Sequence, residues 1–256
     1  MRTLPAGIDQ RSACRHPDWT GPDDLTIKIQ ELREATDWQK PVFVKIGSAR
    51  PRYDVQLAVK AGADVIVLDG MQGGTGATQD VFIEHAGIPT LPALRQAVEA
   101  LQELGQHRKV QLIISGGIRS GADVAKALAM GADAVSIGTA ALIALGCNRR
   151  IHVKDYHALG TEPGACHHCH TGRCPVGITT QDPVLESRLE VEEGARRVRN
   201  FLTVLTMEAQ TLARACGKSH LHNLEPEDLA ALTVEAAAMA GVPLVGTDWI
   251  PGRNAY

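Results

Sequence analysis

The sequence predicts an α/β protein of the (β/α)8 TIM-barrel type in which only the C-terminal four βα units are present, followed by a cysteine-rich loop and C-terminal helices. Three observations support this prediction. Four apolar strand patterns alternate with helix patterns, which is typical of a parallel sheet with crossover helices. Aromatic residues make up only 4% of the 256 residues, whereas alanine, glycine, valine and isoleucine are plentiful. Paired glycines follow the last two strands, where a barrel binds phosphate.

The chain divides into four expected parts. Residues 1–38 form a lead segment with one helix over 21–34, for which Asp23 is the expected N-cap. Residues 39–146 form the barrel half, residues 147–182 the cysteine-rich loop and residues 183–256 a C-terminal helical segment.

Within the barrel half the elements follow from hydrophobic periodicity and glycine positions. Strands are expected over residues 42–46, 65–69, 110–114 and 134–137, and helices over 53–61, 91–104 and 123–130. Gly62 and Gly131 are expected to end two of these helices. No strand is expected after residue 184, where two further helices cover 192–216 and 226–240.

The glycines decide between two architectures that fit this alternation, an open doubly wound sheet and a barrel. A doubly wound dinucleotide-binding domain places its glycine-rich turn after the first strand. Here the backbone N–H groups of Gly116, Gly117, Gly138 and Thr139, with Ser115 beside them, could converge on one phosphate after the last two strands. The alternative is that these glycines serve only as tight turns.

Four strands are half the number in a complete barrel. Half a barrel leaves two strand edges open to solvent, which soluble proteins normally avoid. Another chain could complete the barrel, the sequence could be a fragment of a longer one, or the sheet could close in another way. The chain by itself is therefore expected to aggregate or to dimerise.

Four of the six cysteines lie in one segment, residues 147–181. Cys166, Cys169 and Cys174 form C-x2-C-x4-C followed by proline, and Cys147 lies upstream. Thiols this close together usually converge on a metal ion or a cluster. The Cys-Pro ending favours iron–sulfur over zinc, for which the neighbouring histidines could complete a mixed site. Free thiols in a surface loop are the remaining alternative.

The composition argues against several classes of partner. A net charge of −3 provides no basic face for nucleic acid. The chain has no run of eighteen apolar residues and no signal-peptide core at its start, so we expect a cytoplasmic protein without membrane attachment. In that compartment clustered cysteines indicate metal binding rather than disulfides.

Several motifs together resemble a known family. Residues 70–78 (GMQGGTGAT), 115–120 (SGGIRS) and 138–147 (GTAALIALGC) resemble the FMN domain of glutamate synthase, and residues 169–181 (CHTGRCPVGITTQ) resemble its cluster loop. The C-terminal helices are similar to those of stand-alone glutamate-synthase-like proteins, including the FMN subunit of N-methylglutamate synthase. The resemblance implies an FMN-binding barrel and a [3Fe–4S] cluster held by three cysteines in the pattern C-x5-C-x4-C.

The chain departs from this family pattern at the cysteines. The resemblance matches Cys147, Cys169 and Cys174 to the three ligand positions, yet twenty-one residues separate the first two, and Cys166 is an extra thiol. The ligands could be the last three cysteines, or the three matched ones, or all four could hold a [4Fe–4S] cluster. The family's earlier strands and its glutamine-hydrolysing domain have no counterpart here, which implies a truncated or split enzyme.

The candidate active-site residues follow the first two strands. Lys45 matches the family's V-K lysine at the C-terminal end of a strand, and a reduced flavin needs a cation near its pyrimidine oxygen. Gln72 and Thr75 could bind substrate or flavin, although loop polarity explains them equally well. Gly73 and Gly74 between them are candidates for cofactor binding.

The resemblance also implies a reaction. Ammonia or an amine condenses with 2-oxoglutarate to an imine, reduced FMN delivers hydride, and the cluster supplies electrons. Arg50 is a candidate for pairing with a substrate carboxylate, and Asp69 for catalysis or for turn capping. Because no nicotinamide fingerprint is present, an electron-donor protein and other subunits are the expected partners.

Three other interpretations compete with this one. A barrel like that of IMP dehydrogenase shares the SGGIRS element, but it needs a catalytic cysteine loop, and residues 87–110 contain no cysteine. The chain could instead be a non-catalytic electron-transfer or scaffold subunit that holds a cluster and completes a partner's barrel. It could also be an inactive fragment.

Overall fold

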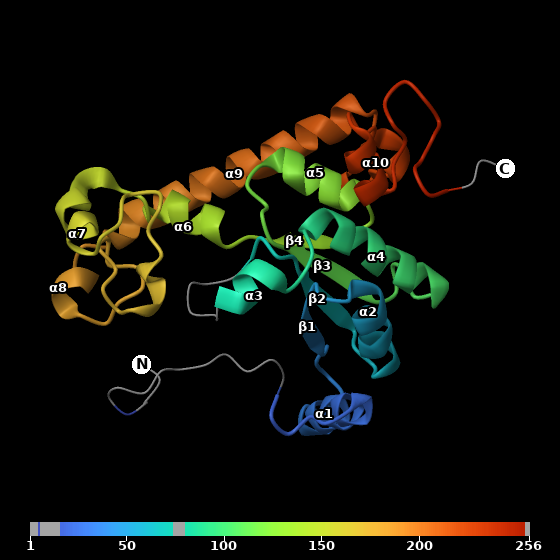
Figure 1. Ribbon diagram of the computed structural model, residues 1–256, viewed down its shortest axis with the longest axis horizontal. Helices are drawn as coiled ribbons and strands as arrows, with labels where there is room; N and C mark the ends of the chain where they lie inside the picture. Colours follow the sequence, from blue (N-terminus) through green and yellow to red (C-terminus); the bar gives the residue numbers. More distant parts are fainter. Residues whose placement is uncertain (1–4, 6–15, 74–79, 254–256) are drawn as a thin grey trace.

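The computed structural model describes residues 5, 16–73 and 80–253. A parallel sheet of four strands lies at the centre of the molecule, with the strands side by side in chain order (Figure 1). A doubly wound sheet reverses its strand order at a switch point, whereas a barrel keeps chain order. The predicted barrel type, with four of its strands present, is therefore confirmed. The strands are β1(Phe43–Gly47), β2(Val65–Asp69), β3(Gln111–Ser115) and β4(Ala134–Ser136).

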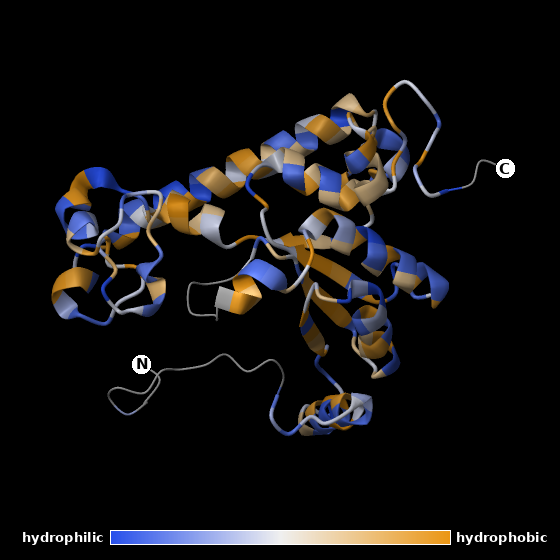
Figure 2. Cartoon of the chain, in the orientation of Figure 1, coloured by the Kyte–Doolittle hydropathy of each residue, from blue (hydrophilic) through white to orange (hydrophobic). Residues whose placement is uncertain are grey.

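One face of the sheet carries the main hydrophobic core. Helices α2(Pro51–Lys60), α4(Thr90–Glu103) and α5(Gly121–Ala129) follow the first three strands in this part of the fold. The β2 and β3 side chains that belong to this core are Ile66, Leu68, Leu112 and Ile114, and all four are fully buried. Figure 2 shows these strands in hydrophobic colours.

The opposite face of the sheet is open. Because side chains alternate along a strand, Phe43, Lys45, Val67 and Ile113 belong to this second face. Phe43 is 55% exposed. Within the described residues β1 and β4 pair with no further strand, so the sheet has two free edges. The expected half-barrel geometry is present.

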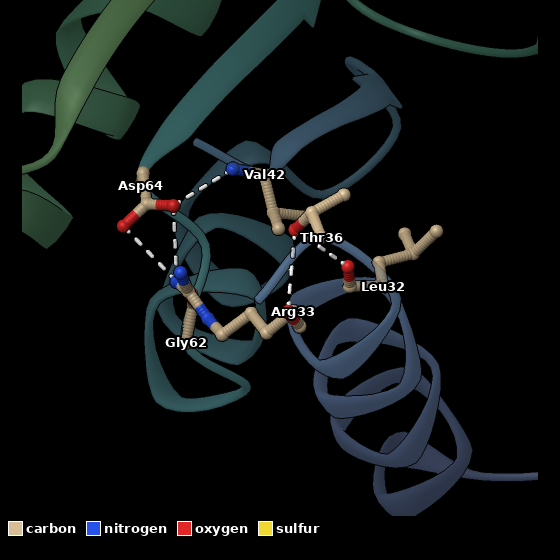
Figure 3. Close-up of polar contacts among 6 residues, drawn as sticks. All are labelled: Leu32, Arg33, Thr36, Val42, Gly62 and Asp64. Atoms are coloured by element: carbon tan, nitrogen blue, oxygen red, sulfur yellow. Dashed lines mark hydrogen bonds and ion pairs between the residues drawn. The ribbon is translucent and has the colours of Figure 1, made fainter. Parts of the chain in front are cut away.

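Helix α1(Pro22–Ala35) is connected to the sheet by a partly buried ion pair. Arg33 reaches from the last turn of the helix and donates to Asp64 at 3.0 Å and to the Gly62 carbonyl at 2.6 Å (Figure 3). Asp64 also accepts from the Val42 N–H at 2.7 Å. Burial raises the pKa of Asp64, but the hydrogen bonds from Arg33 and Val42 outweigh it and hold that pKa below its usual value.

The prediction that Asp23 is the N-cap of α1 is wrong. Gly21 occupies the N-cap position, and Asp24 reaches back to accept hydrogen bonds from the Thr20 and Gly21 N–H groups at 2.7 and 2.8 Å. The third helical residue can fold back over the first turn in this way, whereas Asp23 is one position too early.

Helix α9(Val191–Ala215) is the long C-terminal helix predicted from the sequence. Its buried face consists largely of small residues, Gly194, Ala209 and Ala213, together with Leu205. Leu202 and Leu212, which we expected on the apolar stripe, are 41% and 40% exposed. The buried face of α9 carries small side chains because α5 packs closely against it. A Cβ on Gly121 of α5 would lie 2.4 Å from the Leu205 carbonyl of α9.

The helix predicted over 226–240 is wrong as a single element. The chain forms a 3-10 turn, Pro226–Asp228, and then the short helix α10(Val234–Ala240). Between them the Ala231 N–H donates to the Pro243 carbonyl, and the Ala231 carbonyl accepts from the Val245 N–H, both at 2.8 Å. Thr233 is the N-cap of α10. These long-range backbone bonds replace the helical ones, and apolar periodicity does not reveal them.

The segment 147–190, which we call the cysteine lobe, projects from the sheet on α6(Thr139–Leu145) (Figure 1). It contains α7(Val153–Ala158), α8(Pro183–Glu186), and the 3-10 turns Arg150–His152 and His168–His170, none of which we predicted. A further short helix, α3(Asp80–His85), follows β2. Among the described helices, none has both the length and the apolar character required to span a bilayer.

Candidate functional site

An open pocket of about 790 Å³ lies at the carboxyl ends of the strands, the edge where barrel enzymes carry their active sites. Eight of the predicted site residues line it: Lys45, Gln72, Gly73, Ser115, Gly116, Gly117, Gly138 and Thr139. Gly74 and Thr75 lie outside the described residues. The pocket thus brings together residues that are more than ninety positions apart in the chain.

Among the lining residues that were not predicted to belong to the site, three carry a polar or aromatic side chain. Arg119 follows the glycine turn after β3, Ser136 ends β4, and Phe201 comes from α9. The SGGIRS motif contains Arg119 and could have identified it. Phe201 carries no such signal, because only the packing of α9 against α6 brings it to the pocket.

Lys45 lies on the open face of β1 and forms an ion pair with Asp69 at the end of β2, with a distance of 3.0 Å between Nζ and Oδ2. The lysine side chain is 63% exposed and that of the aspartate 23%. The other carboxylate oxygen of Asp69 is buried and has no hydrogen-bond partner among the described residues. A Cβ on Gly73 would lie 2.5 Å from that oxygen, so glycine is needed where the loop passes it.

Gln72 has a structural role in the loop after β2. Its amide oxygen accepts from the Thr90 N–H at 2.9 Å and from the Thr90 hydroxyl at 2.7 Å. The same hydroxyl is 2.8 Å from the Gly116 carbonyl, so Gln72 and Thr90 connect the loops after β2 and β3. A Cβ on Gly70 would lie 2.0 Å from this hydroxyl. Gln72 therefore orders the loops that form the pocket.

The glycine turn after β3 has the geometry of an anion-binding loop. Gly116 and Gly117 have φ values of 109° and 77°, which side chains other than that of glycine rarely allow. The N–H groups of Gly117, Gly138 and Thr139 donate to no acceptor within the described residues. All three residues are exposed toward solvent. Unpaired N–H groups on adjacent loops fit a phosphate.

Arg50, our candidate for a substrate carboxylate, does not line this pocket. Its guanidinium pairs with Asp54 one turn along α2 at 3.2 Å and is largely exposed. An i,i+4 ion pair of this kind explains the residue without a ligand.

Three of the four cysteines of the lobe lie around Tyr156. Cys174 and Tyr156 are buried together with Val176, and Cys166 packs against them. The Tyr156 hydroxyl donates to the Cys147 carbonyl. Cys169 is exposed and Cys147 half-buried. The insertion between Cys147 and Cys169 therefore folds back and returns the later cysteines to the first.

The electrostatics of the thiols differ in a way that suits a ligand set. Burial raises the pKa of Cys147, and so do the three other cysteines near it, Cys169 first. Burial also raises the pKa of Cys174, but hydrogen bonds from the backbone N–H groups of residues 176, 178 and 179 bring it below its usual value. Cys174 thus loses its proton more readily than an ordinary thiol, and the thiolate is the form that binds iron.

In the part of the chain that the structure describes, no three His, Cys, Asp or Glu side chains are placed to hold a single metal ion. A zinc site needs its sulfur ligands about 2.3 Å from one ion. A cluster has several irons bridged by sulfide, so its thiolates stand further apart. The arrangement of the described thiols is therefore not that of a single-ion site.

Helix α6 joins the two sites. Thr139, its first residue, lines the pocket, and Cys147 follows two residues after its end. The eight residue steps from Thr139 to Cys147, at about 1.5 Å each, correspond to about 12 Å along a helix axis. Leu142, Ile143 and Ala144 of the same helix also line the pocket. A group bound in the pocket and one held by the thiols would be near neighbours.

Comparisons with known proteins show the family to which the chain is related. A family profile described as "Conserved region in glutamate synthase" matches residues 1–219. The chain is 70% identical over its full 256 residues to a glutamate synthase large subunit-like protein of Rhizobium meliloti (strain 1021), of which it covers 58%. It is 43% identical over 225 residues to an archaeal glutamate synthase [NADPH] of Methanocaldococcus jannaschii, covering 87% of this chain and 41% of that protein.

A solved structure of a mutant flavocytochrome b2 with benzoylformate aligns with a TM-score of 0.50 at 23% identity, over 79% of this chain and 37% of that one. This likeness concerns the fold alone. The chain spans about half the length of the relatives that it matches. With a profile match over most of its residues and high identity along its whole length, the chain belongs to the glutamate synthase family.

Proposed function

We propose that this chain forms the flavin and cluster part of an oxidoreductase that reductively aminates 2-oxoglutarate to glutamate or to an N-substituted glutamate. The observation that carries the proposal is the direct connection, through α6, between the pocket of glycine loops and the cysteine lobe. An enzyme in which a cluster passes electrons one at a time to a flavin, which then delivers hydride, needs these two groups close together.

FMN would be held by the loops at the carboxyl ends of the strands. Its phosphate suits the free N–H groups of Gly117, Gly138 and Thr139, with the Arg119 guanidinium beside them. Bound there, FMN supplies hydride for reduction of an imine. The pocket also leaves Ser115 and Ser136 as hydrogen-bonding groups at the ends of β3 and β4.

Lys45 supplies a positive charge on the side of the pocket formed by β1 and β2. Its ion pair with Asp69, with 3.0 Å between Nζ and Oδ2, holds the ammonium at the pocket wall. Because the lysine side chain is 63% exposed, both solvent and a ligand can still reach it. A cation at that wall favours an anionic group next to it, either the reduced flavin ring or a carboxylate of 2-oxoglutarate. In this proposal Asp69 positions the Lys45 ammonium.

The nitrogen donor in this proposal is free ammonia or an amine, and the electrons come from a partner protein. Cys147, Cys166, Cys169 and Cys174 are the residues that would hold a [3Fe–4S] or [4Fe–4S] cluster. Cys169 is exposed, which leaves one side of the lobe accessible to an electron donor.

The test uses protein expressed from the natural gene, with whatever sequence flanks this chain, purified without oxygen. We expect a flavin spectrum, protein-bound iron and sulfide, and formation of glutamate or an N-alkylglutamate from 2-oxoglutarate with ammonium or methylamine and a chemical reductant. Lys45→Met should lower turnover at least about tenfold while FMN stays bound, since one charge interaction is lost. Lys60→Met, at the far end of α2, is the control. Protein without flavin, or Lys45→Met with full turnover, would overturn the proposal.

A second candidate function follows from the open face and free edges of the sheet. The chain could be an electron-transfer or scaffold subunit that completes a barrel together with another polypeptide. In that case the isolated chain would keep iron but bind no FMN, and FMN binding would appear only after the partner is added. A monodisperse isolated chain that binds FMN tightly would exclude this candidate.

A further inference from the structure

Cys166 is the one thiol of the lobe without a place in the three-cysteine pattern. It lies only three residues before Cys169, at the entrance to the 3-10 turn His168–His170. A solvent-facing loop position would leave such a thiol exposed. Instead Cys166 is half-buried and packs against the small core formed by Tyr156, Cys174 and Val176.

Tyr156 connects three of the four cysteines, Cys147, Cys166 and Cys174. Its ring is only 1% exposed and is covered on one side by Cys174 and Cys166. Its hydroxyl holds the carbonyl of Cys147. Cys169 lies three residues after Cys166, within the 3-10 turn His168–His170.

We propose that Cys166 is a ligand together with Cys147, Cys169 and Cys174, so that the lobe holds a [4Fe–4S] cluster rather than a three-iron one. The inference rests on the proposed function, because it specifies the cluster assigned there. Four thiolates are the usual complement of a [4Fe–4S] cluster, one for each iron. With every iron bound by protein, the cluster has no open site for substrate and is suited to electron transfer alone.

The turns at Gly164 and Gly172 also support Cys166 as a ligand. Both glycines have positive φ, 101° and 75°, and bracket the segment that carries Cys166 and Cys169. The Gly164 N–H donates to the Asn148 side chain at 3.1 Å, which ties the start of this segment to the residue after Cys147. The turn thus holds Cys166 on the same side as the first cysteine.

The test compares the cluster in wild-type protein and in Cys166→Ser, both made anaerobically from the natural gene. Wild-type protein should contain about four irons and four sulfides per chain. It should show no EPR signal when oxidised and a signal when reduced. Cys166→Ser should fall to about three irons and show an EPR signal in the oxidised state, as three-iron clusters do. Cys216→Ser, at the end of α9 and outside the lobe, is the matched control and should be unchanged.

Cys166→Asp provides a second test of Cys166 as a ligand if the serine variant folds poorly. A carboxylate can still bind the fourth iron, so we expect about four irons with an altered EPR signal. Wild-type protein with about three irons and an oxidised-state signal would overturn the inference, and so would Cys166 variants identical to wild type. A complete absence of iron would instead overturn the cluster part of the proposed function, so the two failures are distinguishable.

Discussion

The sheet and the cysteine lobe are stabilised by different forces. Under the helices the sheet buries a continuous aliphatic core in which Leu68, Leu112 and Ile114 are fully inaccessible. The core of the cysteine lobe contains only Tyr156, Cys174 and Val176 as buried members. Such a small apolar core rarely supports a folded unit by itself. The comparison teaches that hydrophobic burial is extensive in the sheet and small in the lobe, and we propose that a group bound by the thiols adds to the stability of the lobe.

The pocket lies at the strand ends, and its lining comes from these ends, the loops after them, α6 and Phe201 of α9. Its floor comes from strand ends that the hydrophobic core holds rigidly, and one wall comes from α6, which leads into the lobe. We therefore expect changes in the sheet core to affect the stability of the whole molecule. Changes in the lobe should affect the cluster and the α6 wall first.

The largest effect is expected from removing a thiol at the centre of the lobe. Cys174→Ala should abolish iron binding and leave residues 147–190 sensitive to proteolysis, while the sheet remains folded, because the lobe has little other stabilisation. Limited proteolysis followed by mass spectrometry measures both. Cys216→Ala, an exposed thiol, should change neither. A protease-resistant lobe in iron-free Cys174→Ala protein would show that apolar packing is sufficient there.

A cavity in the sheet core should produce the opposite pattern. Leu112→Ala removes a fully buried side chain from β3 and should lower the free energy of unfolding by about 2–5 kcal/mol. The iron content of the folded protein should not change. Leu232→Ala, whose side chain is 82% exposed, should change stability by no more than about 0.5 kcal/mol. Denaturant unfolding provides the comparison, and equal effects of the two substitutions would contradict the assigned core.

A charge at the glycine turn should weaken FMN binding without affecting either region. Gly117→Asp places a carboxylate beside the expected phosphate, and we expect affinity to fall at least about 100-fold, which corresponds to about 2.7 kcal/mol. Gly117→Asn has nearly the same size, and asparagine tolerates positive φ comparatively well, so it isolates the charge. Flavin fluorescence titration measures both variants. If aspartate and asparagine weaken binding equally, the phosphate lies elsewhere.

The smallest expected effect concerns pH and the ion pair at the rim of the sheet. The pKa of Asp64 is lowered in the folded state, so its ionised form contributes stability above the unfolded value of about 3.9. That contribution is lost as the pH falls through the lower, folded pKa. Asp64→Asn should destabilise the protein at pH 7 by about 1 kcal/mol, a modest value because the carboxylate is 40% exposed.

The difference between wild type and Asp64→Asn should therefore shrink as the pH is lowered below about 4, where the wild-type carboxylate becomes protonated. Thermal melts of the two proteins at pH 7 and in acid measure this change. Glu34→Gln, at an exposed position nearby on α1, should show no such pH dependence. A constant difference between wild type and Asp64→Asn at every pH would contradict the role of the ion pair.

Local patterns were sufficient to predict the strands and most of the larger helices, because these elements follow from periodicity and glycine stops. β2 begins and ends at the predicted residues, and Gly62 and Gly131 adopt the positive φ expected of residues that end helices. The helix over 226–240 failed because Ala231 bonds to a distant segment. The short helices of the cysteine lobe were missed because they follow no apolar period and depend on packing around Tyr156.

The sequence by itself determined the barrel type, the glycine loops and the four candidate thiols, because each depends on residue type and spacing along the chain. Only the tertiary structure decided that Lys45 pairs with Asp69, that Gln72 joins two loops through Thr90, and that the insertion after Cys147 returns Cys166 to the other cysteines. The physical reason is that these contacts join residues from different elements. Which side chains meet there depends on strand register and helix packing, and neither is encoded in a local pattern.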